Sequence, residues 1–374
     1  MLPAPGPPFR AEHIGSLLRP AELLRAREQH AAGKLDRAGL RAIEDAAIAD
    51  VVKLQEGLGL QVITDGEFRR GTYSDSFTSA GISGVKIEMT EDQGWTKSQS
   101  HGHRMARRIP KVVDRIAWQG PQNAEDFRYL KSLTARTPKI TLPGPCYIHY
   151  RAGRANISRA AYPDLDAFWS DLVAAYAQEM RSLADAGCGY LQIDETSLVK
   201  LGDPRVRQLL AERGDDWRDL LRSYIGVVNA VVAAAPKGMT IGIHVCRSQD
   251  PSWQADVGYD PISEPLFNEM QVDTYFLEYD NARAGTFAPL RSVPAGKFVV
   301  LGLVASRSTE VESADALERR IEEASREIKL EQLGLSPQCG FSTSAAEHVA
   351  VTEAVEKAKL ARVVEVARQV WGSA

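Results

Sequence analysis

The sequence predicts a (β/α)8 barrel, an α/β fold of the TIM-barrel type, from three observations. Short apolar segments alternate with amphipathic helical segments along nearly the whole chain, which is the pattern of a parallel sheet covered by helices. A first strand near residues 13–16 brings the strand candidates to eight, the number that closes such a barrel. No Gly-x-Gly-x-x-Gly or Walker-type loop opens a βα unit, which argues against an open dinucleotide-binding sheet.

Each predicted element rests on its apolar periodicity and on the signals at its ends. The helix over residues 164–186 is the clearest, because apolar positions recur every three or four residues and Gly187 can end it. A capping-box pattern predicts that the last helix begins near Ser344. Helices are expected at 38–57, 164–186, 216–234, 312–329 and 344–370. Strands are expected at 13–16, 61–64, 139–142, 190–194, 240–244, 272–277, 298–303 and 333–335.

The domain organisation follows from the lengths of the connections. Residues 72–135 are too long for a simple βα connection, so we expect an excursion over the barrel mouth there. The Pro-rich start predicts a flexible extended arm over about residues 1–9. The whole chain, 1–374, is expected to form a single barrel domain.

Composition narrows the classes of partner and compartment. A net charge of −4 over 374 residues argues against nucleic acid or an anionic membrane as the main partner. No apolar stretch is long enough to span a membrane, and the start lacks the apolar core of a signal peptide. Four cysteines are too few for a disulfide scaffold. We therefore expect a reduced, cytoplasmic protein.

Four residues at predicted strand ends have the chemistry of metal ligands. His244 and Cys246 are two positions apart on one strand, so their side chains point to the same side. Glu278 and Cys339 each follow a short apolar run. Zinc binds such mixed nitrogen, sulfur and oxygen ligands in tetrahedral geometry. The alternative for His244 and Cys246 is a core histidine beside an inert buried thiol.

Further polar residues fall where the barrel strands end, which is where barrel enzymes place their catalytic groups. These residues are Ser16, Asp65, Glu67, Asp194 and Glu195. Structural roles remain open for two of them. Glu67 can pair with Arg69 or Arg70, and Asp194 can cap the next helix.

Six ordered motifs between about Phe9 and Val370 resemble the C-terminal catalytic barrel of cobalamin-independent methionine synthase, and more closely its short single-barrel relatives. The motifs are Glu-His-Ile-Gly-Ser16, Ile-Thr-Asp-Gly-Glu67-Phe-Arg-Arg, Leu-Gln-Ile-Asp194-Glu, Ile-His244-Val-Cys246, Leu-Glu278-Tyr-Asp and Leu-Ser-Pro-Gln-Cys339-Gly-Phe. The resemblance implies that His244, Cys246, Glu278 and Cys339 hold Zn²⁺. It also implies that Glu67 and Asp194 bind the ammonium of homocysteine, and that Ser16 with its neighbouring backbone receives the carboxylate.

The activity that the resemblance implies is zinc-dependent transfer of a methyl group to the thiolate of homocysteine, forming methionine. Coordination deprotonates a thiol whose pKa is ordinarily near 8.5, and zinc has no redox role in such a step. The expected partners are homocysteine and a methyl donor, either 5-methyltetrahydrofolate or a methyl-corrinoid.

The donor half of the site departs from the family pattern. The family's leaving-group histidine is missing from residues 302–308, where Arg307 lies near the matching place. The family's pterin-stacking tryptophan is also missing, and Tyr147, His149 or Tyr150 can take its place. The basic segment 98–111 is either a flap that meets an anionic donor or a solvated surface loop.

Two alternative functions remain. The first resembles epoxyalkane:coenzyme M transferase, which has a similar zinc site but alkylates another thiol. Glu67 and Asp194 argue against it, because two acids suit an ammonium and repel a sulfonate. The second is a scaffold protein with a purely structural zinc site, which would use four protein ligands and leave no open position.

Overall fold

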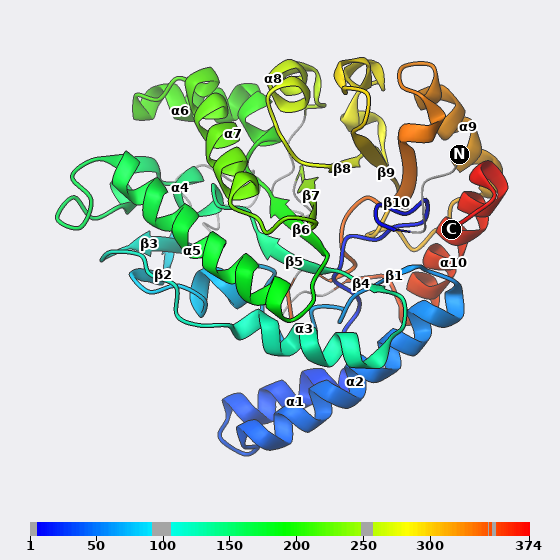
Figure 1. The fold of residues 1–374 in the computed structure, drawn as a ribbon, viewed down its shortest axis with the longest axis horizontal. Helices are drawn as coiled ribbons and strands as arrows, with labels where there is room; N and C mark the ends of the chain where they lie inside the picture. Colours follow the sequence, from blue (N-terminus) through cyan, green and yellow to red (C-terminus); the bar gives the residue numbers. More distant parts are fainter. Residues whose placement is uncertain (1–5, 92–105, 248–256, 343, 346–348) are drawn as a thin grey trace.

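The structure is a computed structural model that describes residues 6–91, 106–247, 257–342, 344–345 and 349–374 (Figure 1). Residues 1–5 of the expected arm and residues 98–105 of the basic segment lie outside the described residues.

A parallel sheet forms the centre of the molecule, as the alternating apolar runs predict. Six strands pair side by side in the order β10-β9-β8-β7-β6-β5, each parallel to its neighbours. These strands are β5 (Ile140–Pro143), β6 (Tyr190–Glu195), β7 (Thr240–Val245), β8 (Thr274–Glu278), β9 (Phe298–Val304) and β10 (Leu333–Pro337). A second parallel pair joins β1 (Val62–Ile63) to β4 (Thr137–Pro138), and β4 leads almost directly into β5.

Residues 10–17 lie between the last strand and the first. The N–H of Glu12 donates to the carbonyl of Leu335 at 2.9 Å, and the N–H of Leu335 donates to the carbonyl of Arg10 at 2.8 Å. On the other side, the Thr64 hydroxyl donates to the carbonyl of Gly15 at 2.7 Å. The predicted strand at 13–16 is not assigned as one in the described chain, although its neighbours connect β10 with the end of β1.

The helices surround the strands in Figure 1. They are α1 (Ala21–Ala31), α2 (Arg37–Leu58), α3 (Gln122–Leu133), α4 (Tyr147–Tyr150), α5 (Leu165–Asp185), α6 (Pro204–Arg213), α7 (Trp217–Ala233), α8 (Ser263–Asn268), α9 (Ala314–Ser325) and α10 (Glu353–Trp371). The four helices predicted at 38–57, 164–186, 216–234 and 312–329 correspond to α2, α5, α7 and α9. Each of these four begins after a capping side chain that accepts a backbone N–H: Asp36, Asp164, Asp216 and Ser313.

The predicted start of the last helix is wrong. The helix α10 begins at Glu353, after Thr352, whose side chain accepts the N–H of Val355. Ser344 instead forms an isolated antiparallel bridge with Thr72. A long-range contact therefore overrides the local capping-box pattern.

The long connection after β1 contains its own elements. A five-residue π-helix, η1 (Asp75–Ser79), is followed by an antiparallel hairpin of β2 (Val85–Glu91) and β3 (Ala106–Val112), and then by α3.

Buried apolar side chains fill the space inside and outside the strands. A small inner cluster contains Ile14, Val62, Tyr190, Phe276 and Val300, while the larger core packs the helices against the outer face of the sheet. Within the described residues, no helix is both long and apolar enough to cross a membrane.

Candidate metal centre

The four predicted ligands meet at the carboxyl ends of three strands. His244 is the second-last residue of β7, and Cys246 directly follows that strand. Glu278 is the last residue of β8, and Cys339 lies just past β10. One ligand atom from each lies within 4.8 Å of all the others, and all four residues are buried. The arrangement brings residues nearly a hundred positions apart to one point.

The electrostatics of this cluster favour a bound cation. The Sγ atom of Cys246 lies 4.0 Å from the Sγ of Cys339 and 3.5 Å from Oε1 of Glu278. The Cys339 thiol, by hydrogen bonding, lowers the pKa of Cys246 well below its usual range, whereas the same contact raises the pKa of Cys339. Burial, together with the charge of Cys246, raises the pKa of Glu278 to about 8. Negative charge placed here without a cation is therefore costly.

The imidazole of His244 has a nitrogen available to coordinate a metal ion. Both of its ring nitrogens are buried without a hydrogen-bond partner among the described residues, an arrangement that native proteins rarely leave unexplained. Burial lowers its pKa, but the interactions with Cys246, Asp194 and Glu278 outweigh burial and raise the pKa to about 9. One nitrogen, two sulfur and one oxygen donors fit Zn²⁺.

Two residues that the sequence reasoning missed hold Glu278 in place. The Arg247 backbone N–H donates to Oε2 of Glu278 at 2.7 Å, and the Arg247 guanidinium lies 3.4 Å from the same oxygen. The hydroxyl of Tyr259 accepts the N–H of Glu278 at 2.7 Å and donates to the carbonyl of Val245 at 3.1 Å. The Tyr259 hydroxyl therefore ties the end of β7 to the end of β8. Arg247 could have been noticed in the sequence, because a basic residue directly follows the proposed ligand Cys246.

The carboxylate of Asp194 lies beside the cluster, and Glu67 lies near Asp194. Asp194 is the register partner of His244 across β6 and β7, and its Oδ1 accepts a hydrogen bond from Gln192 at 2.7 Å. Burial raises the pKa of Asp194 to about 7; His244 opposes this shift and Glu67 adds to it. Asp194 lies within β6, so it does not cap a helix.

Glu67 combines strain with an unpaired oxygen. Its backbone φ is +61°, in the left-handed region that few non-glycine residues adopt. Oε1 accepts the Thr141 hydroxyl at 2.7 Å and lies 3.5 Å from Nη1 of Arg70, so the ion pair considered from the sequence is present. Oε2 is buried and has no partner among the described residues. This oxygen can accept a hydrogen bond from a ligand.

Ser16 and Arg307 contact the turn that follows Cys339. A methyl group built on Gly340 would lie 1.9 Å from the Ser16 hydroxyl, so that hydroxyl faces the backbone beside Cys339. The Ser16 carbonyl accepts the N–H of Phe341 at 3.0 Å. From the other side, Arg307 Nη1 donates to the carbonyls of Gly340 and Phe341 at 3.0 and 2.7 Å.

The carboxylates of Asp65 and Glu195, which also lie at strand ends, accept hydrogen bonds from backbone N–H groups. Oδ1 of Asp65 accepts the N–H of Glu67 at 2.9 Å. The carboxylate of Glu195 accepts the N–H groups of Ser197 and Cys146 at 3.0 and 3.2 Å.

Of the three aromatic candidates for the donor side, only Tyr147 is partly exposed. Its ring meets that of Tyr73 edge to face with centroids 5.8 Å apart, and the Tyr73 hydroxyl lies 3.5 Å from that of Thr196. His149 is buried, with Nδ1 2.8 Å from the Tyr224 hydroxyl. Tyr150 is also buried.

Lys200, in the short helix η3 (Val199–Gly202) after β6, is a further buried cation that the sequence reasoning missed. Its Nζ lies 5.7 Å from the centre of the Tyr150 ring. Burial and then Arg151 lower the pKa of Lys200 to about 8, against the opposing charge of Cys246. Lys200 therefore contributes positive charge near the cluster.

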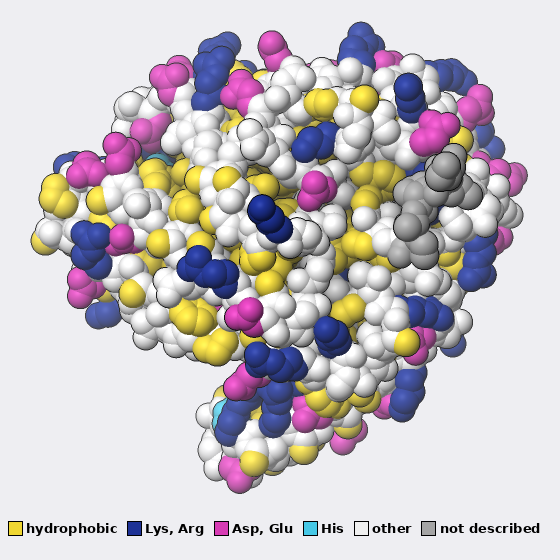
Figure 2. Space-filling view, in the orientation of Figure 1, with side chains coloured by type: hydrophobic (Ala, Val, Ile, Leu, Met, Phe, Trp, Pro, Cys, Tyr) yellow, Lys and Arg dark blue, Asp and Glu magenta, His cyan; other side chains and the backbone are white. Residues whose placement is uncertain are grey.

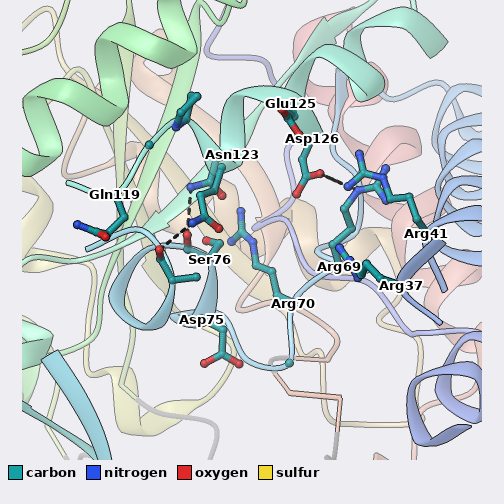
Figure 3. A pocket seen from close by; sticks show the side chains of 15 residues that line it. Arg37, Arg41, Arg69, Arg70, Asp75, Ser76, Gln119, Asn123, Glu125 and Asp126 are labelled. Atoms are coloured by element: carbon teal, nitrogen blue, oxygen red, sulfur yellow. Dashed lines mark hydrogen bonds and ion pairs between the residues drawn. The ribbon is translucent and has the colours of Figure 1, made fainter. Parts of the chain in front are cut away.

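A separate cavity of about 470 Å³ lies beside the segment that follows Glu67 (Figure 3). Its arginines are already paired, since Arg69 contacts Asp45 at 2.6 Å and Asp126 at 3.0 Å, and Arg41 contacts Asp126 at 2.7 Å. On the face shown in Figure 2, basic and acidic side chains are likewise interspersed. The cavity contains none of the four clustered residues.

Comparison with known families shows to which protein family the chain is related. The model of the family described as "Cobalamin-independent synthase, Catalytic domain" matches residues 9–369. The chain belongs to this family. The resemblance inferred from the six motifs is thereby confirmed.

Members of the family differ in length and in what is known of them. Two uncharacterized proteins of Bacillus subtilis, YxjG and YxjH, are 39% and 36% identical over 98% and 97% of this chain and 95% of their own lengths. A 5-methyltetrahydropteroyltriglutamate–homocysteine methyltransferase of Thermosynechococcus vestitus is 26% identical, and the match covers 92% of this chain but 41% of that protein. The chain thus spans about two fifths of the longer enzyme.

Solved structures support the family fold. A Listeria monocytogenes protein assigned provisionally as a vitamin-B12-independent methionine synthase is 32% identical, covers 98% of this chain and 99% of its own, and has a TM-score of 0.75. A B12-independent methionine synthase from Shewanella, in complex with selenomethionine, has a TM-score of 0.73 at 19% identity, with 97% of each chain covered. The second likeness concerns the fold alone.

Proposed function

We propose that this protein is a zinc-dependent homocysteine S-methyltransferase, with methionine as its product. The observation that supports this most strongly is the buried cluster of His244, Cys246, Glu278 and Cys339 beside Asp194, which has a second carboxylate, that of Glu67, near it. Metal ligands next to paired acids suit a small thiol that also bears an ammonium group. Family membership adds independent support.

The scaffold we propose is one closed (β/α)8 domain. Residues 10–17 take the eighth position between β10 and β1, and β4 with β5 serves as one interrupted strand. The hydrogen bonds from Leu335 to Arg10 and from Thr64 to Gly15 support this closure. The contacts of Tyr73 with Tyr147 and Thr196 support an excursion over residues 72–135 that begins above the mouth.

His244, Cys246, Glu278 and Cys339 would hold the zinc ion. When bound, zinc lowers the pKa of a coordinating thiol, so that the thiolate forms near neutral pH. Four protein ligands also fit a structural site, so the test must ask whether a substrate sulfur can reach the metal.

The chain's own residues would position homocysteine. Glu67 Oε2 and the carboxylate of Asp194 bind the ammonium, and the Ser16 hydroxyl with the backbone near Gly340 receives the carboxylate. In the reaction a bond forms between the homocysteine sulfur and the methyl carbon, and the bond from that carbon to the donor breaks. The donor leaves with the electron pair, and the thiol proton is released.

For the donor side we propose that Tyr147 with Tyr73 forms the aromatic surface, because His149 and Tyr150 are buried. Arg307 cannot readily supply a proton, since a guanidinium stays charged and this one already donates to two carbonyls. A corrinoid donor needs no proton on leaving, whereas a folate donor would need another acid. No disulfide bond joins any of the four cysteines, all of which the structure describes, and this fits a reducing, cytoplasmic location.

The test combines a product assay with X-ray absorption at the zinc edge. Zinc-loaded protein is given homocysteine with 5-methyltetrahydrofolate, methylcobalamin or simple methyl donors, and methionine is measured. The metal should gain one sulfur ligand when homocysteine is added. An unchanged ligand set and no methionine with any donor would refute the proposal, and turnover of 2-mercaptoethanesulfonate instead would favour the coenzyme M alternative.

A matched pair of cysteine variants provides the control. Cys339→Ser should lose most zinc and most activity, whereas Cys188→Ser should retain both. The two thiols are equally buried, at 5% exposure, but Cys188 lies before β6, where its Sγ donates to the carbonyl of Tyr190 at 3.4 Å. A metal-free, fully active Cys339→Ser variant would contradict the assignment.

A further inference from the structure

A line of buried polar side chains leads from the inside of the sheet to Asp194. Lys139, whose side chain is 0% exposed, donates from Nζ to Oε2 of Glu12 at 3.1 Å, to Oε1 of Gln192 at 2.9 Å and to the carbonyl of His13. Gln192 in turn donates from Nε2 to the carbonyl of Ile14 at 2.6 Å and to Oδ1 of Asp194 at 2.7 Å. All three ammonium protons and both amide protons are therefore placed.

The ammonium of Lys139 fixes which way the Gln192 amide points. An ammonium can only donate, so the amide atom that faces Lys139 must be the oxygen. The amide nitrogen must then face Asp194, to which it presents an N–H. Without the cation, the amide could turn over and present its oxygen to the carboxylate.

Filling a core with these buried charges is unfavourable in free energy. The Nζ of Lys139 lies 4.5 Å from the centre of the Phe276 ring and 5.4 Å from that of Tyr190, in the apolar inner cluster. A buried ion pair is often no more stabilising than apolar residues of similar volume. Packing alone therefore does not account for Lys139 and Glu12 at this place.

The orientation also leaves one oxygen of Asp194 available. Oδ1 is occupied by Gln192, and the carboxylate accepts no other hydrogen bond from a described residue. Asp194 faces His244 across the β6–β7 pair, so an ammonium at the remaining oxygen would lie close to the metal cluster.

We propose that Lys139 and Gln192 are positioning residues that act through Asp194, holding its carboxylate so that Oδ2 receives the ammonium of the incoming thiol. This inference rests on the proposed function, since it assumes that the acceptor carries an ammonium. It assigns ammonium selectivity to residues that do not touch the substrate.

The test is the nearly isosteric variant Gln192→Glu. This variant keeps an oxygen toward Lys139 but removes the N–H that Asp194 accepts and sets a second carboxylate against it. Isothermal titration calorimetry with zinc-loaded protein compares homocysteine with 4-mercaptobutanoate, which is the same thiol without the amino group. The matched control is Gln332→Glu. The Gln332 amide nitrogen likewise makes two hydrogen bonds, but both go to backbone carbonyls, those of Pro294 and Lys297, and it lies before β10, away from Asp194.

The expected result is specific to the amino group. In Gln192→Glu the Kd of homocysteine should rise at least about tenfold, the cost of a lost hydrogen bond to a charged group, while the Kd of 4-mercaptobutanoate stays within about twofold. An equal loss for both thiols, or no loss for either, would overturn the positioning role. Gln192→Met serves the same comparison if Gln192→Glu fails to retain zinc.

The wild-type measurement separates the two proposals. If the wild-type protein prefers homocysteine and Gln192→Glu keeps that preference, the positioning role fails and the proposed function stands. If the wild-type protein does not prefer homocysteine over 4-mercaptobutanoate, the ammonium site itself is refuted and both fail together.

Discussion

Gly340 offers the sharpest steric test of the site. It follows Cys339 directly, and a methyl group added there would lie 1.9 Å from the Ser16 hydroxyl oxygen, 3.2 Å from Ser16 Cβ and 3.3 Å from the Ser16 carbonyl oxygen. Carbon and oxygen that are not bonded do not approach so closely, so Gly340→Ala must push these atoms apart by about 1 Å.

Either way of relieving the clash should impair function. If Ser16 rotates, its hydroxyl leaves the place proposed for the carboxylate of homocysteine; if the 339–341 turn shifts, Cys339 leaves the metal cluster. Because a misplacement of about 1 Å can cost about a hundredfold in rate, we expect kcat/KM for homocysteine to fall by about tenfold to a hundredfold. The first route raises KM at normal zinc content, and the second lowers zinc content.

The assay is steady-state methionine formation together with zinc quantification. Gly226→Ala is the matched control, because Gly226 is exposed in the middle of α7 and a methyl group there meets nothing within 4 Å; it should leave activity unchanged and stabilise the helix by up to about 1 kcal/mol. Unchanged kcat/KM and full zinc content in Gly340→Ala would refute the geometry described for Ser16.

Three further predictions concern stability. A chelator should lower the melting temperature and added zinc should restore it, because binding to the folded state alone contributes about 4 kcal/mol when free zinc is about a thousandfold above Kd; no change in melting temperature would contradict a metal at the cluster. Phe276→Ala should cost about 3–5 kcal/mol in denaturant unfolding, since Phe276 is fully buried in the inner cluster and lies against the Lys139 ammonium; a loss under about 1 kcal/mol would show that the cluster repacks. Burial, with Glu353 adding to it, raises the pKa of Glu356 to about 8 although it accepts the N–H of Leu18 at 2.8 Å. The folded state then binds this proton more tightly than the unfolded state, so the contribution of Glu356 to stability falls as pH rises from about 4.5 to about 8. Glu356→Gln should flatten that part of the stability curve and gain at least about 1 kcal/mol over wild type above pH 8, and parallel curves for the two proteins would disprove the shift.

The strands of the sheet were predictable because each is a short apolar run, and those predicted at 190–194, 240–244 and 333–335 also follow a predicted helix. The first predicted strand, at 13–16, was not assigned because Gly15 has a φ of +138° and its carbonyl accepts a side-chain hydroxyl, that of Thr64, instead of a strand N–H. The prediction of the start of α10 failed for a different reason. The sequence at Ser344 has the capping-box pattern, but Ser344 pairs with Thr72, more than 250 residues earlier. Local patterns cannot reveal such contacts.

In the site, too, the features set by local sequence patterns were predictable and those set by long-range contacts were not. The convergence of the four proposed ligands was predictable, because polar or sulfur-containing residues end apolar runs and parallel strands bring their carboxyl ends together. The role of Tyr259, whose hydroxyl lies between Val245 and Glu278, was not predictable, because Tyr259 belongs to no predicted helix or strand. Gln192 could have been found, since it shares a strand face with Asp194 two positions away.

The left-handed backbone at Glu67 has a consequence for how this protein tolerates change. Holding a non-glycine residue at a φ of +61° costs on the order of 1–2 kcal/mol, and glycine or asparagine would avoid most of that cost. Selection for heat resistance alone would thus favour losing the very carboxylate proposed to recognise the amino acid. Glu67→Gly and Glu67→Asn should melt higher as they become worse enzymes, a trade-off that directed evolution would meet early.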